Sequence, residues 1–372
     1  MTRKKSIATR VVLTGLITLM VLALIFTGGC SQPQPAAPAP ADPAAPAPAA
    51  PAEPEKTYDP VELNLCNFMA PMHPLNAQLL GPWADEVAEK TDGRVKIFIY
   101  PSNELVGAND NYDATVQGVI DIGLVLPAYT PGRFPLTHIL EFPFMFESAL
   151  QANLTAWEVF NTTDAIRDGE YKDVEVLWWG TTDLGHFLTV DPKSSKADLQ
   201  GNRLRSPSII GNDVINALGA VPVTLPVPEV YDAIDRGIVD GTLLPISTLN
   251  SFNLGEVVNN VLEMNMYATP LHMVMNRDSW NKISPSDQAI IKETLSTFPE
   301  TIGNMYVHDT ERGYTRAEED GITITTPTAE ALAEFHQYMD PLIDGWLDDM
   351  EADGLPAREV YELVRSVSEK YK

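Results

Sequence analysis

Cysteine is scarce in this 372-residue chain: Cys30 and Cys66 are the only two, so the sequence contains no framework of disulfides. Metal-binding patterns are missing too, since there is no C-x-x-C, no H-E-x-x-H and no EF-hand loop. Walker and G-x-G-x-x-G loops and the G-x-S-x-G nucleophile elbow are also absent. The sequence therefore gives no reason to expect a metal, a cofactor or a catalytic nucleophile, and it predicts a protein that is not an enzyme.

Basic residues are few as well. The chain has 25 Lys and Arg against 51 Asp and Glu, a formal net charge of −26. Binding to nucleic acid requires basic surface that displaces counterions, so this composition excludes nucleic acid as a partner. A negative field also repels free anions at long range, so any anion-binding site must be locally basic. Apolar residues make up 44% of the chain, which is enough to form a core.

One apolar run stands out, at residues 12–26, directly after a basic N-terminal stretch. It is shorter than the roughly 20 residues of a spanning helix, and its length and flanks are typical of a signal peptide over residues 1–29. Thr27-Gly28-Gly29 before Cys30 resembles a lipoprotein signal, although Thr27 stands where Leu or Val is usual. Lipidation at Cys30 is the prediction, and an uncleaved N-terminal anchor is the alternative. Both place the rest of the chain outside the cytoplasmic membrane.

Residues 30–57 are rich in proline and alanine. Such a sequence is extended and semi-rigid, and it cannot build a core. We interpret this segment as a tether that joins the lipidated cysteine to a globular part and lets that part meet a partner in the membrane.

The globular part begins with alternating strand and helix patterns. Strands are expected at residues 61–69, 95–100 and 120–125, with a helix at 75–91 after the first of them. Two further strand–helix units follow between residues 201 and 245. This alternation predicts an α/β fold with parallel strands and covering helices.

Arg205 lies at the end of a short strand expected over residues 202–206, next to a proline. Ligands of open parallel sheets bind outside the carboxyl ends of the strands. A planar guanidinium group grips a carboxylate through two parallel hydrogen bonds. We therefore expect Arg205 on the rim of a cleft, holding an anionic ligand, and a surface ion pair with one of the many acids is the alternative.

Four spaced motifs surround this arginine. They read G-N-R-L-R-S-P at 201–207, G-A-V-P-V at 219–223, P-E-V-Y-D-A-I at 228–234 and G-I-V-D-G at 237–241. Their order and spacing resemble the extracytoplasmic solute-binding proteins of TRAP transporters, the DctP-like family. The resemblance extends over roughly residues 61–365.

The resemblance implies a periplasmic-binding-protein-like fold, with two α/β domains, a ligand cleft between them and a long bracing helix. The first domain is expected to comprise residues 58–181 with about 270–300, and the second residues 182–269 with part of 301–372. The long helix that bridges the two domains is expected over residues 284–320.

The function implied by the resemblance is capture of an organic acid outside the cytoplasmic membrane and its delivery to the membrane subunits of a TRAP permease. No cofactor is implied. Two alternatives remain open at this point. One is a ligand-binding sensor subunit for a membrane kinase, and the other is a lipid-anchored hydrolase or lyase that uses carboxylates in the cleft.

The resemblance also assigns the arginine that pairs with the ligand carboxylate to Arg205. Some family members carry a second arginine about twenty residues earlier, where this chain has Gly185 and His186. We name His186 and Arg133 as candidates for a second contact to the anion. A structural histidine and an ordinary surface arginine are the alternatives.

Three more residues complete the set of candidate ligand contacts. Leu244 stands where the family often has a polar amide, so the ligand is expected to be more apolar than a sugar acid. Leu244 as an ordinary core residue is the alternative. Tyr129 and Phe68 lie in loops that follow strands and are expected to stack on a ligand, with core packing as the alternative.

Overall fold

The computed structural model describes residues 57–372, and residues 56–372 form one compact unit. The predicted signal peptide, the lipidation site Cys30 and nearly all of the tether lie outside the described residues. In the part of the chain that is described, no helix is both long and apolar enough to cross a membrane.

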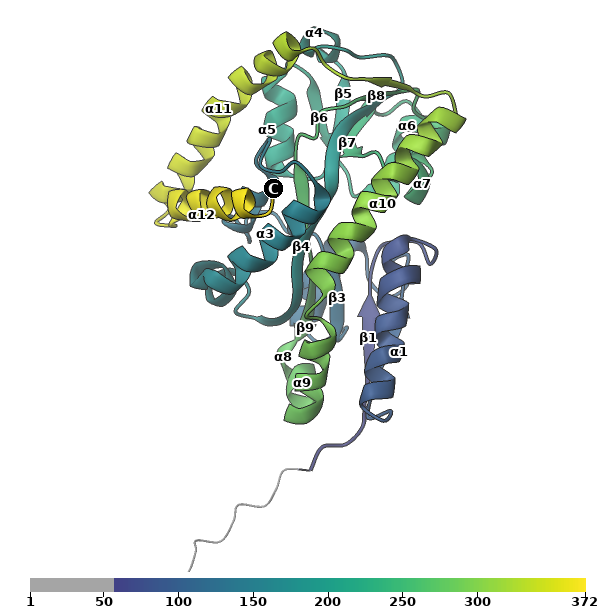
Figure 1. Ribbon diagram of the computed structural model, residues 1–372, viewed down its shortest axis with the longest axis vertical. Helices are drawn as coiled ribbons and strands as arrows, with labels where there is room; N and C mark the ends of the chain where they lie inside the picture. The colour runs from purple at the N-terminus through teal and green to yellow at the C-terminus, as the bar shows by residue number, and fades with distance from the viewer. Residues whose placement is uncertain (1–56) are drawn as a thin grey trace, which may run out of the picture. The chain divides into compact units, whose positions relative to one another are not determined.

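The strands of the described part form one mixed sheet in the order β2-β1-β3-β9-β4-β7-β5-β6, and β8 and β10 extend it beside β4 (Figure 1). Their bounds are β1 (Val61–Cys66), β2 (Val95–Tyr100), β3 (Ile122–Val125), β4 (Val174–Thr189), β5 (Arg203–Ser206), β6 (Val221–Thr224), β7 (Gly241–Pro245), β8 (Asn260–Leu262), β9 (Ala268–Asn276) and β10 (Thr323–Thr325). The α/β class and the parallel pairing of β1 with β2 and β3, and of β5 with β6 and β7, are as predicted.

The long strand β4 joins the two halves of the sheet. Its first part pairs with β9 beside β3, and residues 185–189 pair with β7 and β8. The register between β4 and β9 shifts between Thr181 and Leu184, so Thr182 and Asp183 lie at an irregularity. Irregularities of this kind re-aim side chains and bend a strand. One continuous strand therefore crosses from one half of the sheet to the other.

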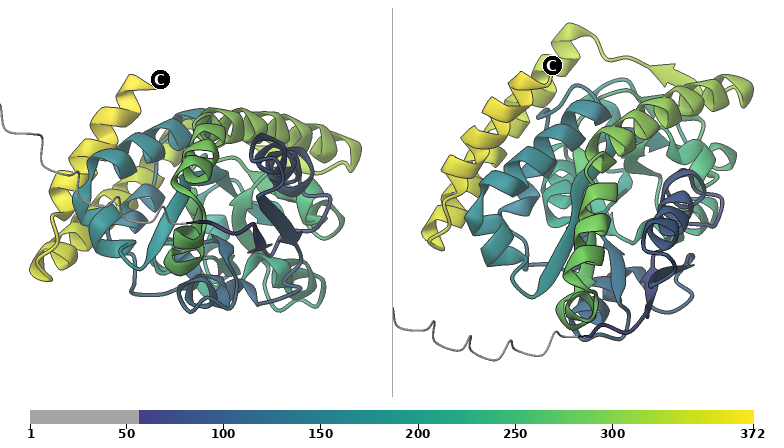
Figure 2. Two further views of the ribbon diagram at one scale, coloured as in Figure 1. Left: turned by 90° about the horizontal axis from the view of Figure 1, so that it is seen from below. Right: turned by 60° about the horizontal axis from the view of Figure 1, so that its bottom comes forward.

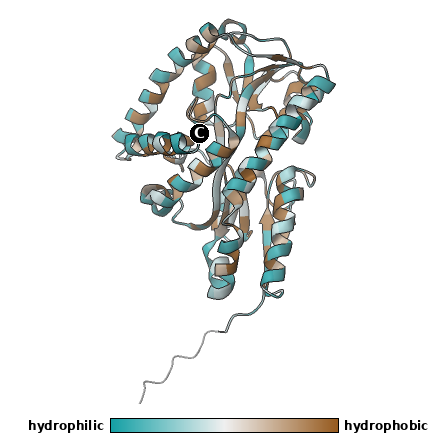
Figure 3. Cartoon of the chain, viewed as in Figure 1, coloured by the Kyte–Doolittle hydropathy of each residue, from teal (hydrophilic) through white to brown (hydrophobic). Residues whose placement is uncertain are grey.

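Helices cover both faces of this sheet, and their bounds are α1 (Gly81–Lys90), α2 (Asn111–Val116), α3 (Ala149–Thr162), α4 (Lys196–Leu199), α5 (Ile209–Ala217), α6 (Val230–Asp235), α7 (Thr248–Ser251), α8 (Arg277–Lys282), α9 (Pro285–Thr294), α10 (Phe298–Glu319), α11 (Ala329–Ala352) and α12 (Ala357–Lys370). Apolar residues concentrate on the strands and on the inner helix faces, and polar residues follow the outer faces of α10, α11 and α12 (Figure 3). Ser208 caps α5 by accepting a hydrogen bond from the backbone N–H of Gly211 at 2.9 Å.

The bracing helix is present as two segments, α9 and α10, which run one after the other across the sheet (Figure 2). The sequence predicted this helix over residues 284–320. It is interrupted at residues 295–297, and Pro299 lies in the first turn of α10, where a missing N–H costs nothing. On α1, the Trp83 indole donates a hydrogen bond to Thr294 of α9 at 3.0 Å. The other segment, α10, packs against α3, β4 and α7.

The two C-terminal helices lie against different parts of the fold. α11 packs on α5 beside the second half of the sheet, and α12 packs on α3. Gln151 of α3 donates a hydrogen bond to the Ser368 carbonyl oxygen of α12 at 2.9 Å. The chain therefore returns across both halves after the bracing segments, and α12 lies beside elements that precede the crossing strand.

Candidate functional site

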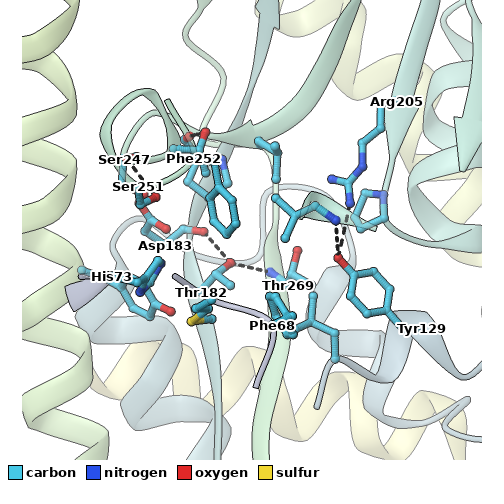
Figure 4. A pocket seen from close by; sticks show the side chains of 18 residues that line it. Phe68, His73, Tyr129, Thr182, Asp183, Arg205, Ser247, Ser251, Phe252 and Thr269 are labelled. Carbon is cyan, nitrogen blue, oxygen red and sulfur yellow. Dashed lines mark hydrogen bonds between the residues drawn. The ribbon is translucent and has the colours of Figure 1, made fainter. Parts of the chain in front are cut away.

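A cavity of about 510 Å³, part of it open to solvent, lies where segments from both halves of the sheet meet (Figure 4). The lining side chains come from the loops after β1 and β3, the crossing part of β4, the ends of β5 and β7, the α7 region, β9 and α10. They are Phe68, Met69, His73, Leu126, Tyr129, Thr182, Asp183, Arg205, Pro207, Val227, Leu244, Pro245, Ser247, Thr248, Ser251, Phe252, Thr269 and Tyr306.

Arg205 enters the cavity from the end of β5, and its side chain is fully buried. Its Nε donates a hydrogen bond to the carbonyl oxygen of Leu225 at 2.8 Å, and Nη2 lies 3.5 Å from the Tyr129 hydroxyl. Nη1 has no hydrogen-bond partner among the described residues, and no carboxylate there forms an ion pair with Arg205. The sequence placed Arg205 at a strand end on the rim of a cleft. It lies at the end of β5 and is fully buried there, because Tyr129 and the segment at Leu225 lie over the strand end.

Tyr129 connects the first half of the fold to the segment that holds Arg205. Its hydroxyl oxygen accepts a hydrogen bond from the backbone N–H of Val227 at 2.8 Å and faces Arg205 Nη2. Burial raises the pKa of Tyr129, although Arg205 opposes the shift, so the hydroxyl remains protonated at neutral pH. Phe68 packs edge-on against the Tyr129 ring, with 5.9 Å between the ring centroids. Both aromatic side chains line the cavity beside the guanidinium group.

Leu244 also lines the cavity, from strand β7. It is nearly buried and at the same time belongs to the main hydrophobic core. The two interpretations of this position, pocket wall and core, therefore apply together. The side chain presents methyl groups where an amide would offer hydrogen bonds.

The two candidates for a second anion contact lie elsewhere. The Arg133 Nη2 pairs with Asp173 at 2.7 Å, and its guanidinium stacks over the Tyr112 ring at 4.6 Å. His186 is buried, and its Nδ1 accepts a hydrogen bond from the backbone N–H of Met264 at 3.1 Å. Burial lowers the pKa of His186 to about 4, so the ring is neutral at neutral pH. Neither side chain lines the cavity that contains Arg205, and both have structural partners of their own.

Gly185 explains why a second arginine is missing on β4. A Cβ atom at this position would lie 2.2 Å from Cε1 of the Tyr267 ring, which packs flat against the glycine. The Tyr267 hydroxyl donates a hydrogen bond to the carbonyl oxygen of Leu243 at 2.9 Å, which fixes the ring there. An aromatic side chain from the neighbouring segment therefore occupies the room that a longer side chain on Gly185 would need.

Sequence reasoning missed the polar residues at the end of the cavity opposite Arg205. Asp183 and Thr182 come from the irregular part of β4, and Ser247 and Ser251 come from the α7 region (Figure 4). The signal available was a polar Thr-Thr-Asp run inside a long apolar strand. The run could be assigned to the cavity only once it was known that β4 crosses the cavity at that point. Among the described residues, no group of three or more potential metal ligands is gathered.

A sheet whose two halves share a crossing strand, with a cavity between them, defines a two-domain α/β ligand-binding protein. The profile of the bacterial extracellular solute-binding proteins, family 7 (DctP), matches residues 67–349. The chain belongs to this family, as the four motifs predicted. It is thereby an extracytoplasmic solute-binding protein of the TRAP transporter type.

Individual relatives agree with the assignment. The outer membrane transporter protein TsaT of Comamonas testosteroni is 23% identical over 82% of this chain and 90% of its own. The solved structure of a marine metagenome TRAP solute-binding protein specific for aromatic acid ligands, in complex with metahydroxyphenylacetate, is 28% identical. It superposes with a TM-score of 0.79 over 84% of this chain and 99% of that one. A TRAP solute-binding protein from Rhodoferax ferrireducens with copurified benzoate gives 0.78 at 28% identity, over 84% and 98%.

Proposed function

We propose that this protein captures a monocarboxylic acid with an apolar body in the cavity beside Arg205 and delivers it to the membrane subunits of a TRAP permease. The observation that carries the proposal is a fully buried guanidinium group that has no carboxylate partner and one unbonded nitrogen. A buried charge without a partner is costly, so such a group is retained where a ligand supplies the counter-charge.

The geometry suits a carboxylate bound by Arg205 and Tyr129 together. The free Nη1 and the neighbouring Nη2 offer N–H donors, and the Tyr129 hydroxyl already accepts from Val227, so its own proton is available to a ligand oxygen. Inside a closed cavity the attraction between a carboxylate and a guanidinium is stronger than in water. Two segments that hold these donors belong to different halves of the fold, so ligand binding favours domain closure.

Apolar side chains line most of the space between the two polar ends of the cavity. Phe68, Leu126, Val227, Leu244 and Phe252 offer no hydrogen bonds to a chain of hydroxyl groups. A buried hydroxyl without a partner costs about 1–3 kcal/mol. The aromatic acids bound by two similar structures, metahydroxyphenylacetate and benzoate, have bodies of this apolar kind. The protein acts by binding and release, and we infer that it is not an enzyme.

A thermal-shift screen of residues 56–372 against organic acids tests the proposed function. Because these residues form one compact unit, they are suited to production without the N-terminal segment. A ligand at a hundredfold its Kd adds about 2.7 kcal/mol to the free energy of unfolding, which is easily measured. Aromatic or aliphatic monocarboxylates should give the largest shifts. A panel in which neutral analogues such as benzamide stabilise the protein as well as their acids do would contradict the proposal.

Leu244 should set the preference against sugar acids. We expect wild-type protein to bind benzoate at least about tenfold more tightly than D-glucuronate, because the glucuronate hydroxyls would lose their water partners. Leu244→Asn supplies an amide at the cavity wall and should narrow this ratio, whereas Leu243→Asn on the same strand, which does not line the cavity, should only lower stability. Calorimetric titration of both acids into the wild type and both variants measures the ratio of the two affinities. A wild-type preference for glucuronate would show that the wall at Leu244 does not act in this way.

We also propose that the protein is anchored to a membrane through a lipid on Cys30, with the segment 30–57 as its tether. The proposal rests on the small residues before Cys30 and on the proline-rich sequence after it. Mass spectrometry of detergent-extracted native protein should find an N-terminal Cys30 that carries a diacylglyceryl group. Cys30→Ser should release the protein from the membrane fraction or leave its precursor uncleaved. A native protein that begins at another residue would overturn the anchor and leave the binding function untouched.

A further inference from the structure

Asp183 lies at the end of the cavity opposite Arg205 (Figure 4). Its side chain is buried to 2% exposure, and it belongs to the irregular part of β4 that crosses between the halves of the sheet. The Thr310 hydroxyl of α10 donates a hydrogen bond to Asp183 Oδ2 at 3.3 Å. No basic side chain among the described residues pairs with this carboxylate.

The surroundings of Asp183 combine hydroxyl groups with the aromatic rings of His73, Phe252 and Tyr306, and one further acid, Asp309, lies nearby. Hydroxyl groups of Thr182, Ser247, Thr248 and Ser251 line the same end of the cavity. Burial raises the pKa of Asp183 to about 7, and neighbouring Asp309 adds to the shift, while the Ser247 and Thr310 hydroxyls oppose it. Both protonation states are therefore populated near neutral pH, and the group at this end of the cavity is either a carboxylate or a carboxylic acid.

We propose that Asp183 selects monocarboxylic acids that carry a hydroxyl group at the end remote from the carboxylate, and that it excludes dicarboxylic acids. This inference rests on the proposed function, because the carboxylate of the ligand is taken to bind Arg205. It assigns the second polar contact of the ligand to a residue on the crossing strand.

A hydroxyl group is the partner that suits Asp183 in both states. The hydroxyl group donates a hydrogen bond to the carboxylate, and its oxygen accepts a hydrogen bond from the carboxylic acid. A ligand ammonium group binds only the ionised form. Above pH 8, where Asp183 is ionised, a second ligand carboxylate would lie against it with no cation nearby, and the like charges would oppose each other at low dielectric.

Ring-substituted benzoates provide a probe series with one constant carboxylate. Calorimetry on residues 56–372 would compare benzoate, the three hydroxybenzoates, the three benzenedicarboxylates and the aminomethylbenzoates, alongside hexanoate, 6-hydroxyhexanoate and adipate for a flexible body. In the wild type at pH 8.5, the best hydroxy acid should bind about tenfold or more tightly than its parent, and the matching dicarboxylate should bind more weakly than the parent.

Two substitutions at Asp183 separate its preference for a ligand hydroxyl group from its exclusion of a second ligand carboxylate. Asp183→Ala should bring the affinity ratio of hydroxy acid to parent acid to within about threefold of one. Asp183→Asn removes the charge and supplies N–H donors, so it should increase the affinity for the matching dicarboxylate by about tenfold or more. Glu311→Gln is the matched control, since this exposed acid on α10 does not line the cavity and should leave both ratios unchanged.

The outcomes also distinguish this inference from the proposed function. Acids whose binding depends on Arg205 but is indifferent to Asp183 would overturn the inference alone. The same holds if an aminomethyl acid binds most tightly, if the dicarboxylates bind the wild type as well as the hydroxy acids do, or if only unsubstituted acids bind. Binding that survives the loss of Arg205, or no binding by any acid of the panel, would overturn the proposed function and the inference together.

Discussion

Replacing Arg205 with methionine should abolish the binding of organic acids and leave the unliganded protein at least as stable as the wild type. Arg205 is fully buried without a carboxylate partner, so the unliganded fold bears the cost of desolvating its charge. Methionine fills a similar volume without that charge, and the loss is the hydrogen bond to Leu225 and the long one to Tyr129, together worth about 1–2 kcal/mol. The free energy of unfolding should therefore be unchanged or rise by about 1–2 kcal/mol.

Denaturant titration with and without the best acid of the screen measures both effects. Ligand at a hundredfold its wild-type Kd should add about 2.7 kcal/mol to the wild type and nothing measurable to Arg205→Met. Arg205→Lys should also bind at least about tenfold more weakly, because an ammonium group cannot reproduce the planar fork.

Arg203→Met is the matched control for this experiment. Arg203 lies on the same strand two residues earlier, is exposed and pairs with Asp240 at 2.6 Å. Its loss should cost at most about 1 kcal/mol of stability and leave the Kd unchanged. An affinity of Arg205→Met within threefold of the wild type would remove the central contact of the proposed site.

Gly313→Ala should lower the free energy of unfolding by about 2–4 kcal/mol, although alanine favours a helix over glycine by about 1 kcal/mol. Gly313 lies in α10, where the bracing helix meets the loop after β7. A Cβ atom there would lie 2.6 Å from the carbonyl oxygen of Ile246 and 2.9 Å from the backbone nitrogen of Ser247. These are backbone atoms, so the helix and the loop must separate to make room.

Urea denaturation of Gly313→Ala and Gly345→Ala tests this expectation, because the free energy of unfolding should fall in the first variant and rise in the second. Gly345 lies in α11 with nothing within 4 Å of a Cβ atom, so its replacement should stabilise the protein by up to about 1 kcal/mol. Gly313→Ala should also weaken ligand binding, because the displaced loop contributes Ser247 and Thr248 to the cavity. Equal stabilisation by both substitutions would show that the helix and the loop are not in close contact.

Local patterns in the sequence were sufficient for the elements and the family. Strand and helix periodicities predicted the α/β class and the parallel pairing of β5 with its neighbours. These features depend on residues close together in the chain, whose preferences can be evaluated without knowing the fold. The motifs at 201–241 likewise identified the family and the strand end at Arg205, because both belong to one continuous stretch.

The composition of the cavity depended on contacts between distant segments. Arg133, His186 and Arg205 were all candidates for holding an anion, and their sequence neighbours did not distinguish them. Packing gave Arg133 a carboxylate partner in Asp173, and it gave His186 two backbone N–H donors. It left Arg205 buried without a carboxylate partner. Asp183 joined the site because β4 crosses the cavity at its irregular point. A charged group becomes a binding site when the fold desolvates it and leaves it unpaired, and both conditions are set by residues far away in the sequence.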